Sequence, residues 1–327
     1  MGFTKGGGNI NWFPGHMAAA TRAIKHRLKI SDLVIEVRDS RIPLSSAHPG
    51  LQPQLSAKRR VIALNKKDLA NPNILNVKWV RHFDSCKQDC IAINAHSRSS
   101  VQKSCLLSNN SLECYIVQEK TKRATVGPLP GVTQDIAGFK IAHRPSIYVL
   151  DTPGVLVPSI PDIETGLKLA LSGSIKDSVV GEERIAQYLL AVLNTRGTPL
   201  HWRHLNNRTE VSQSETENKH EYNLKDLRPK RRKPPNASDV TYIEDLVTGV
   251  QRALHVSLSE FDGNVEDEND LESLIEQQFE VLQRALKIPH KASEARLMVS
   301  KKFLTLFRTG KLGPFILDDV PDANSGF

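Results

Sequence analysis

The chain has 327 residues and a formal net charge of +8, from 44 Lys and Arg against 36 Asp and Glu, which is enough length for about two domains. Its 39% hydrophobic and 24% charged residues are typical of globular proteins, and no stretch approaches the roughly 20 apolar residues of a membrane-spanning helix, which excludes a transmembrane protein. Four cysteines without a C-x-x-C pair exclude a disulfide framework and a zinc ribbon and favour a reducing compartment, while the basic balance indicates an anionic partner.

The start of the chain is basic, because five Lys and Arg residues precede the first acidic residue, Asp32. We expect residues 17–30 to form a basic amphipathic helix, and no apolar region typical of a secretory signal precedes it. One interpretation is an organelle transit segment, and such a helix would also allow peripheral association with an organelle membrane. The other interpretation is an ordinary surface helix with a solvated basic face.

Short apolar runs rich in Val and Ile then alternate with longer segments that have room for helices. The runs are 33–37, 61–64, 90–93 and 147–150. This pattern predicts buried parallel strands in a three-layer α/β sheet. Ligands of such sheets bind at the carboxyl ends of the strands, which is where Asp39, Asn65, Asn94 and Asp151 are expected.

After Gly154 the apolar residues recur at helical spacing, and the second half of the chain is predicted to be helical. The expected helices are 163–172, 182–193, 243–256, 271–286 and 293–307. We therefore predict one domain over 1–175 and a helical domain over 176–327, with a basic linker at about 206–239. The run of Lys and Arg at 228–235 is interpreted as part of a disordered linker or as a nuclear-localisation or RNA-contacting element.

The most specific short motif is Asn65-Lys66-Lys67-Asp68, directly after the apolar run 61–64. An N-K-x-D sequence after a strand is the guanine-specificity motif of GTPases. The Asp68 carboxylate can accept two hydrogen bonds from guanine N1 and its 2-amino group, which adenine does not offer. Asn65 would brace the pocket and the Lys66 stem would cover the base. The alternative for so short a motif is a strand followed by a solvated turn.

Other elements of a GTPase site follow the remaining predicted strands. Asp151-Thr152-Pro153-Gly154 matches the D-x-x-G element, whose Asp holds Mg²⁺ through water and whose Gly N–H meets the γ-phosphate. Thr133, after Gly131-Val132, matches the loop threonine that binds Mg²⁺ directly. Asn94-Ala95 fits the loop whose backbone N–H contacts the guanine oxygen.

The order of these motifs is reversed, because N-K-x-D precedes D-x-x-G, whereas ordinary GTPases have the opposite order. Further motifs are W-F-P-G-H-M at 12–17, V-R-D-S-R-I-P at 37–43 and F-R-T-G-K-L-G at 307–313. Together they resemble the circularly permuted GTPases of large ribosomal subunit assembly, which include bacterial, mitochondrial and plant DAR branches. The resemblance covers most of the chain and implies a P-loop-GTPase-like α/β domain in permuted order, followed by an all-helical domain.

The resemblance implies binding of GTP and Mg²⁺. It assigns the nucleotide to Asn65, Lys66, Lys67, Asp68, Asn94, Ala95, Thr133, Asp151 and Gly154, with Thr133 and Asp151 as metal ligands. Val155 stands where many GTPases have a catalytic Gln, and the family's proposed replacement is His16. The alternative for His16 is a turn residue that caps the helix starting near Met17. The family also implies the large subunit and its rRNA as partners and a mitochondrial location, with the cytosol or nucleus as alternatives.

One essential element is missing. A phosphate loop, G-x-x-x-x-G-K-[ST], is expected between about 96 and 130, yet no glycine occurs between Gly50 and Gly127. The interval is also too short, since a helix, a strand, the loop and a second helix need roughly 50 to 60 residues. The sequence therefore predicts an incomplete sheet and poor GTP binding, despite the family's GTPase activity.

Three functions remain open on the sequence alone. The first is a GTPase of ribosome assembly, with Lys301, Lys302, Arg308 and Lys311 on a basic helix as candidate RNA contacts. That basic helix also fits a merely solvated cationic face. The second function is a nucleotide-independent isoform that binds RNA or the ribosome, and the third possibility is an unstable truncated product.

Overall fold

The computed structural model describes most of the chain outside its loops. The described residues are 10–11, 15–100, 136–143, 146–155, 159–160, 162–196, 202, 237–289 and 294–321. They divide into two compact units, one formed by Gly181–Gly313 and the other by Gly7–Val180 together with Pro314–Phe327. Within the described residues, no helix is both long and apolar enough to cross a membrane.

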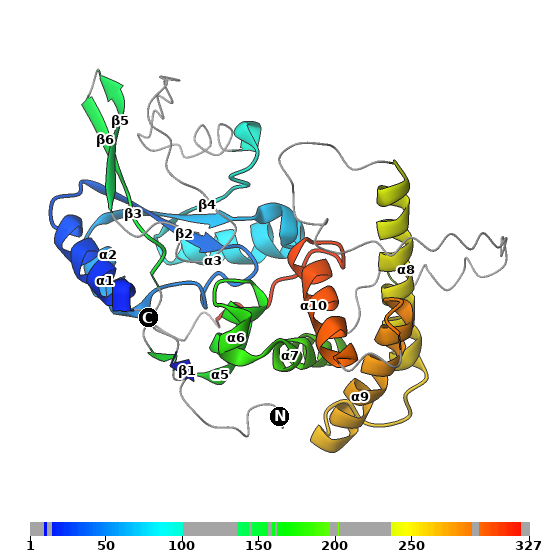
Figure 1. Ribbon diagram of the computed structural model, residues 1–327. Coiled ribbons are helices and arrows are strands. Elements are labelled where there is room, and N and C mark those ends of the chain that lie inside the picture. The colour runs from blue at the N-terminus through cyan, green and yellow to red at the C-terminus, as the bar shows by residue number, and fades with distance from the viewer. Residues whose placement is uncertain are drawn as a thin grey trace. The chain divides into compact units, whose positions relative to one another are not determined.

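The larger unit contains a parallel sheet of three strands, in the order β2-β3-β4 (Figure 1). The strands are β2 (Leu33–Asp39), β3 (Arg59–Asn65) and β4 (Asp89–Ala92). Their register places Asp39 beside Asn65 and Leu64 beside Ala92, so the carboxyl ends of the strands lie together. The prediction of an α/β unit with parallel strands over the first three apolar runs is confirmed.

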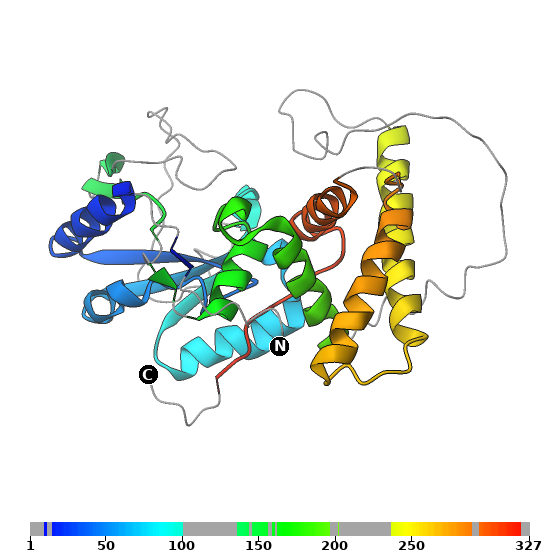
Figure 2. The same ribbon diagram turned by 60° about the horizontal axis from the view of Figure 1, so that its bottom comes forward.

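Helical segments between the strands cover one face of this sheet. They are the 3-10 turn η2 (Pro49–Leu51) with α2 (Gln52–Ser56), and the π-helical η4 (Ile74–Val80) with α3 (Arg81–Ser85). Ile62 and Leu64 of β3 form a buried cluster with Leu75, Trp79 and Phe83 of η4 and α3. Figure 2 shows this helical segment running along the sheet. Burial of a large apolar side chain contributes about 1.5–3 kcal/mol, so this cluster is a main source of the unit's stability.

A second cluster anchors the helix predicted at 17–30, which extends as α1 over Gly15–Leu28. Ile24 and Leu28 pack with Leu51 and Leu55, and Val34 of β2 packs against the same cluster. The helix is therefore part of the folded unit through its apolar face. Its basic residues Lys25 and Arg27 lie in the last turn, where positive charge complements the helix dipole.

The fourth apolar run is a strand, as predicted, but within the described residues it does not join the parallel sheet, so the predicted parallel pairing is wrong there. It lies in β6 (Ser146–Asp151), which pairs antiparallel with β5 (Ala137–His143) as a separate two-stranded sheet (Figure 1). The antiparallel pairing with β5 follows from the connection, because only positions 144 and 145 separate these strands, whereas a parallel pairing of the two would need a crossover of a dozen residues or more. A third pairing joins the short strands β1 (Ile10–Asn11) and β7 (Ser159–Ile160).

The incomplete sheet leaves apolar side chains at its surface. Ile35 and Val37 of β2 are 58% and 61% exposed, and Tyr148 of β6 is 66% exposed. The expectation that both apolar runs are buried is therefore wrong for these residues. Both strands have one described partner on one side only, β3 for β2 and β5 for β6. This agrees with a sheet that lacks a strand.

The helices predicted after Gly154 are confirmed. In the larger unit they are α5 (Ile163–Leu171) and the short α6 (Asp177–Val180). In the smaller unit they are α7 (Glu182–Thr195), α8 (Ala237–Ser259), α9 (Glu268–Ala285) and α10 (Ala295–Arg308). Because α8 begins at Ala237, the end of the predicted linker at 206–239 is helical, and 203–236 lie outside the described residues. Asp162 and Asp267 cap α5 and α9 by accepting two backbone N–H groups each.

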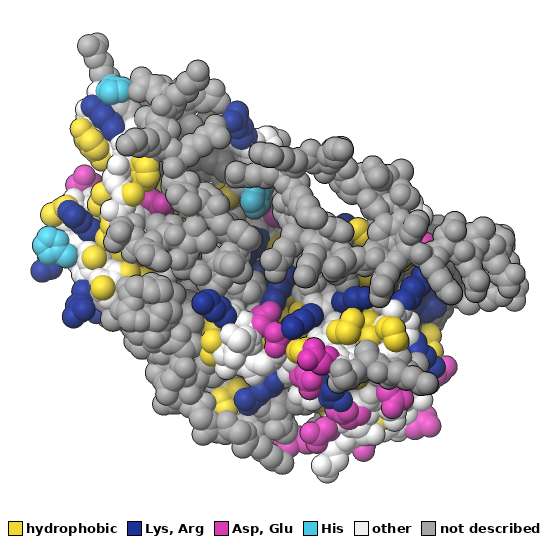
Figure 3. Space-filling model, in the orientation of Figure 1, with side chains coloured by type: hydrophobic (Ala, Val, Ile, Leu, Met, Phe, Trp, Pro, Cys, Tyr) yellow, Lys and Arg dark blue, Asp and Glu magenta, His cyan; other side chains and the backbone are white. Residues whose placement is uncertain are grey.

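The smaller unit has an apolar interior and a mixed charged surface. Leu190, Leu274, Leu282 and Phe303 are fully buried, each at most 1% exposed. Its surface carries both signs, and Figure 3 shows acidic and basic side chains interspersed over its visible face. The net positive charge of the whole chain therefore does not make the surface of this unit uniformly positive.

Candidate functional site

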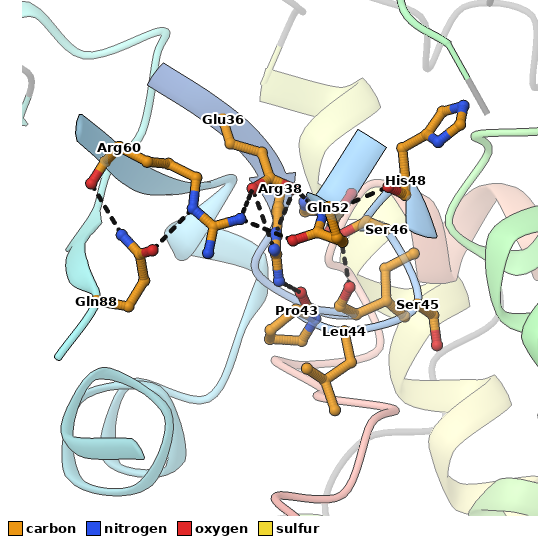
Figure 4. Close-up of polar contacts among 12 residues, drawn as sticks. Glu36, Arg38, Pro43, Leu44, Ser45, Ser46, His48, Gln52, Arg60 and Gln88 are labelled. Atoms are coloured by element: carbon orange, nitrogen blue, oxygen red, sulfur yellow. Dashed lines mark hydrogen bonds and ion pairs between the residues drawn. The ribbon is translucent and has the colours of Figure 1, made fainter. Parts of the chain in front are cut away.

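A buried polar network holds β2 and β3 together below their carboxyl ends (Figure 4). Glu36 accepts two hydrogen bonds from Arg38, at 3.0 and 3.1 Å, and one from Arg60 at 3.1 Å. Arg60 also donates to Gln52 of α2 at 2.7 Å and to Gln88 at 2.7 Å. A half-buried carboxylate that is shared between two guanidinium groups fixes the register of the strands, because a one-residue slip would separate all of these partners.

The next turn of chain is held by the same network. Arg38 donates to the carbonyl oxygen of Pro43 at 3.0 Å, which ties the turn at 40–46 to the end of β2. The Asp39 N–H donates to Ser46 Oγ at 3.1 Å, and Ser46 in turn donates to the carbonyl oxygen of Ile42 at 2.6 Å. The turn that contains the D-S-R motif is therefore built by hydrogen bonds from both of its ends.

Asn65 stands at the centre of the predicted site and joins three segments. Its Oδ1 accepts the Ala95 N–H at 3.0 Å, and its carbonyl oxygen accepts the Ser40 N–H at 2.8 Å. This is the bracing role expected for Asn65. The Ala95 N–H, which was expected to contact the guanine oxygen, is thus engaged with Asn65, and Ala95 itself is exposed.

Lys66 adopts a left-handed backbone conformation with φ of 61°, which is uncommon for a residue other than glycine. Its ammonium lies 2.9 Å from Asp39 Oδ2, while its side chain is 43% exposed. The following 3-10 turn η3 (Lys67–Leu69) is closed by a bond from the Leu69 N–H to the Lys66 oxygen, and Lys67 N–H donates to Ile93. Asp68 lies in this turn with its carboxylate exposed, as a ligand-facing acceptor must be.

Asp39 lies at the carboxyl end of β2, as the sequence predicted, but its partner Arg41 is a residue that sequence reasoning missed, since the D-S-R motif served only to identify the family. Arg41 donates to both oxygens of Asp39, from Nε at 3.0 Å and from Nη2 at 2.7 Å. Burial would raise the pKa of Asp39, but the hydrogen bonds and charges of Arg41 and Lys66 outweigh it and lower the pKa to about 2. An ionised carboxylate therefore holds Lys66 in place. The signal available in the sequence was an Asp directly after an apolar strand.

Asn94 lies at the end of the third strand and shapes the adjoining loop. Its Oδ1 accepts the His96 N–H at 2.9 Å, and its own N–H donates to Ser100 Oγ at 3.0 Å. The side chain thus forms an Asx-type turn. The structure brings Asn65, Lys66, Lys67, Asn94 and Ala95 together around the ends of β3 and β4.

The predicted phosphate and metal residues that the structure describes are Asp151 and Gly154. Asp151 is the last residue of β6, at the carboxyl end of its strand as expected, and it pairs with Ala137 in the hairpin. Within the described residues this strand is not part of the parallel sheet that contains Asn65. Gly154 is exposed, and a Cβ built on it would meet no atom within 4 Å, so packing within the chain does not require a glycine there. Thr133 lies outside the described residues.

The remaining predicted residues are placed as follows. His16 is the second residue of α1, so it lies inside the helix rather than before it, and its side chain is outside the described part. Lys301 and Lys311 are exposed, whereas Lys302 and Arg308 are half-buried. The Lys301 ammonium is 3.7 Å from Glu182 of α7, so part of the basic face of α10 has an acidic neighbour that its own sequence did not reveal.

Comparison with known proteins shows close relatives over nearly the whole chain, although no protein-family profile matches it. Short integuments 2, mitochondrial, of Arabidopsis thaliana is 68% identical, and the match covers 99% of this chain and 93% of that protein. DAR GTPase 2, mitochondrial, from the same plant is 36% identical, with coverage of 95% and 91%. Ribosome biogenesis GTPase A of Bacillus pumilus (strain SAFR-032) is 31% identical, with coverage of 56% and 75%.

The lengths of these matches show that the relatives have residues without a counterpart in this chain. The match with Short integuments 2 extends over 360 positions, which exceeds all 327 residues of this chain by 33, so the relative has at least that many residues without a counterpart here. The bacterial match extends over 214 positions but covers 56% of this chain, or about 183 of 327 residues. Both relatives therefore have, within the matched range, some 30 residues in total that have no counterpart in this chain.

Proposed function

This chain belongs to the circularly permuted GTPase family of these relatives, and from that premise we propose that it acts on the large subunit of the mitochondrial ribosome while binding GTP only weakly. The family membership and the names of the two plant relatives, both mitochondrial, confirm the predicted family and location. The association with ribosomes is carried over from the bacterial relative, which is named a ribosome biogenesis GTPase.

Guanine recognition is the half of the proposed site that the described residues fit. Asn65 accepts the Ala95 N–H, the Lys66 side chain is 43% exposed while its ammonium is held by Asp39, and Asp68 is exposed. A carboxylate that accepts from guanine N1 and its 2-amino group selects guanine, because adenine would leave it unpaired. The exposed Asp68 and the bracing of Asn65 support the proposal that N-K-x-D selects guanine.

The phosphate half does not fit, and this observation carries the proposal of weak binding. No glycine occurs from 51 to 126, so the backbone cannot form a loop that approaches phosphate oxygens closely. The excess of some 30 residues in the relatives has the size expected for one segment with the absent strand and loop. We therefore assign the deficit to the interval between Ala95 and Thr133.

The energetic effect of this deficit is large. A hydrogen bond to a charged group is worth about 1.5–3 kcal/mol, so losing three phosphate contacts costs about 4.5–9 kcal/mol. Each 1.4 kcal/mol is a factor of ten, so the dissociation constant should rise by about a thousandfold or more. Guanine contacts alone leave binding in the micromolar range or weaker. We assign no step of hydrolysis to this chain, since Thr133 and Asp151 have no phosphate loop to work with.

Titration with a fluorescent GTP analogue tests the proposal. The expected result is no saturation below micromolar concentrations, and a sub-micromolar dissociation constant would overturn it. A matched variant receives, between Ala95 and Thr133, the internal segment of the 68% identical relative. That variant should bind at least about a thousandfold more tightly if the missing segment is the cause.

A second candidate function is nucleotide-independent binding to ribosomal RNA, favoured by the exposed Lys301 and Lys311 of the helical unit. Co-sedimentation with large mitochondrial subunits, with and without GTP, separates the candidates. Dependence on GTP supports a switch, indifference supports the nucleotide-independent function, and aggregation supports an unstable product. The double variant Lys301→Glu, Lys311→Glu should lower co-sedimentation, whereas Lys78→Glu, at an exposed position of η4, should not.

A further inference from the structure

We infer that the C-terminal segment 314–318 is a positioning element of the guanine-recognition loop at 65–69, and that Asp318 is the residue through which it acts. The segment follows α10 and the helical unit in sequence but belongs to the α/β unit. The inference rests on the proposed function only for what the loop binds. The contacts that carry it lie entirely within the α/β unit.

Asp318 is a buried carboxylate, 6% exposed, that organises the turn at 40–46. It accepts the Leu44 N–H at 2.8 Å, the Ser45 N–H at 2.9 Å and the Ser45 hydroxyl at 2.6 Å. The Lys168 ammonium of α5 lies 3.4 Å from its other side. Hydrogen bonds to a charged acceptor are about twice as strong as neutral ones, so this carboxylate fixes the turn more firmly than packing alone would.

The backbone of the segment contacts both loops of the site. The Leu317 N–H donates to the carbonyl oxygen of Arg41 at 2.7 Å, and the Phe315 N–H donates to that of Leu69 at 3.1 Å. Arg41 belongs to the D-S-R turn and Leu69 to the end of the N-K-x-D loop. Between them Ile316 packs into the cluster that contains Leu64 of β3. One short segment therefore bridges the two loops that meet at the guanine site.

From the turn, the contacts continue to the base-recognising residues. Arg41 holds both oxygens of Asp39, Asp39 holds the Lys66 ammonium at 2.9 Å, and the Ser40 N–H donates to Asn65 at 2.8 Å. The left-handed Lys66 backbone costs of order 1 kcal/mol and persists only where its surroundings over-determine it. The carboxylates of Asp39 and Asp318 are the two acidic groups named in this surrounding, and Arg41 and Lys168 pair with them. Hydrogen bonds and the backbone of the turn at 40–46 thus join Asp318 to Lys66.

An isosteric substitution tests this inference without the need for a nucleotide. Asp318→Asn removes the charge and leaves one acceptor oxygen, which cannot accept both N–H groups of the turn and also pair with the Lys168 ammonium, so the loop should loosen. Hydrogen exchange of the Lys67 and Leu69 amides, which donate to Ile93 and Lys66, should accelerate by about tenfold. The matched control is Asp32→Asn, at an exposed position just before β2 in the same unit, which should leave this exchange unchanged. Ser45→Ala removes a single bond to Asp318 and should give an intermediate effect if Asp318→Asn does not fold.

Two outcomes separate positioning from simple support of the fold. Faster exchange at Lys67 and Leu69, with unchanged exchange in β3, supports positioning. Acceleration confined to the turn at 40–46, or spread evenly over the unit, overturns it. A second readout is the affinity for GMP, which is measured from the chemical-shift changes of the backbone amides of 66–68. This affinity should fall by at least about threefold in Asp318→Asn. If the parent chain does not bind GMP, the proposed guanine site fails, while the exchange result still decides the role of Asp318.

Discussion

The ion pair of Asp39 with Arg41 gives a quantitative prediction. Asp39→Asn keeps the size of the side chain but removes its charge, beside an Arg41 side chain that is 2% exposed. Lys66 would lose the partner that now lies 2.9 Å away. The expected effect is a less stable α/β unit, because the guanidinium of Arg41 stays buried with a weaker acceptor.

The magnitude follows from the pKa of Asp39. Its pKa falls from 3.8 to about 2 in the folded protein, and each unit corresponds to 1.36 kcal/mol, so the charged form contributes about 2 kcal/mol at neutral pH. Removing one member of a buried ion pair typically costs about 3–5 kcal/mol. An Asn retains one acceptor oxygen for Arg41, so we expect a loss of about 2–4 kcal/mol.

The sign of the pH dependence is fixed by the direction of the shift. Since the folded pKa of Asp39 lies below the unfolded value of 3.8, the carboxylate stabilises the fold above about pH 4. This stabilisation is lost as the pH falls from 4 toward 2, where the carboxyl becomes protonated in the folded protein too. The difference between the parent protein and Asp39→Asn should therefore be full at pH 7 and much reduced near pH 2.

Urea unfolding at pH 7, 5 and 3, followed by fluorescence and circular dichroism, measures this difference. Asp89→Asn, an exposed Asp at the start of β4, is the control and should change the unfolding free energy by less than about 0.5 kcal/mol. An equal loss at pH 3 and pH 7 would refute the electrostatic argument. So would an Asp39→Asn variant as stable as the control.

Three further predictions concern other parts of the chain. Asn194 and Gln278 exchange two buried amide hydrogen bonds of 2.9 Å, so Asn194→Leu should cost about 1–3 kcal/mol in urea unfolding, and Asn194→Leu with Gln278→Leu should cost less than the sum of the single changes. Burial raises the pKa of Cys90 to about 12 and Cys86 is exposed, so peptide mapping after iodoacetamide at pH 8 should find Cys86 alkylated first, and equal rates would contradict the burial of Cys90. Ile35→Lys places a charge on β2 at an exposed position, so light scattering should show less aggregation while the unfolding free energy stays unchanged. A loss of stability in Ile35→Lys would instead show that Ile35 is buried in solution.

Much of the fold could be predicted because local periodicity and burial agree in most segments. The run 61–64 becomes the fully buried centre of β3, and 182–193 becomes the amphipathic helix α7. The run 147–150 shows the limit of this reasoning. Its apolar residues indicate a strand but not the direction in which that strand pairs. The antiparallel pairing depends on the two-residue connection between β5 and β6, which the apolar pattern does not reveal.

The N-K-x-D loop at 65–69 could be located from the sequence because its motif is local, whereas the residues that support it lie far away in the sequence. Asn65 to Asp68 are consecutive, so a motif of four residues identifies them in the sequence. Asp39 is 27 positions from Lys66, and Asp318 is 273 positions from Ser45. Such contacts depend on where the topology brings distant segments together, and a single sequence contains no periodic signal for them. The acidic neighbours of α10 were missed for the same reason, since Glu182 lies on another helix.

The division of the α/β unit into two stretches of sequence also affects how it is synthesised. The helical stretch 181–313 lies between them, so a nascent chain presents Leu44 and Ser45 long before it presents Asp318. The helical unit is continuous and can fold as soon as it emerges, whereas the α/β unit must wait for the segment that follows it. During this interval the turn at 40–46 lacks its carboxylate and Ile316 is absent from its cluster. Chaperones would therefore meet the α/β unit in an open form throughout translation of the helical one.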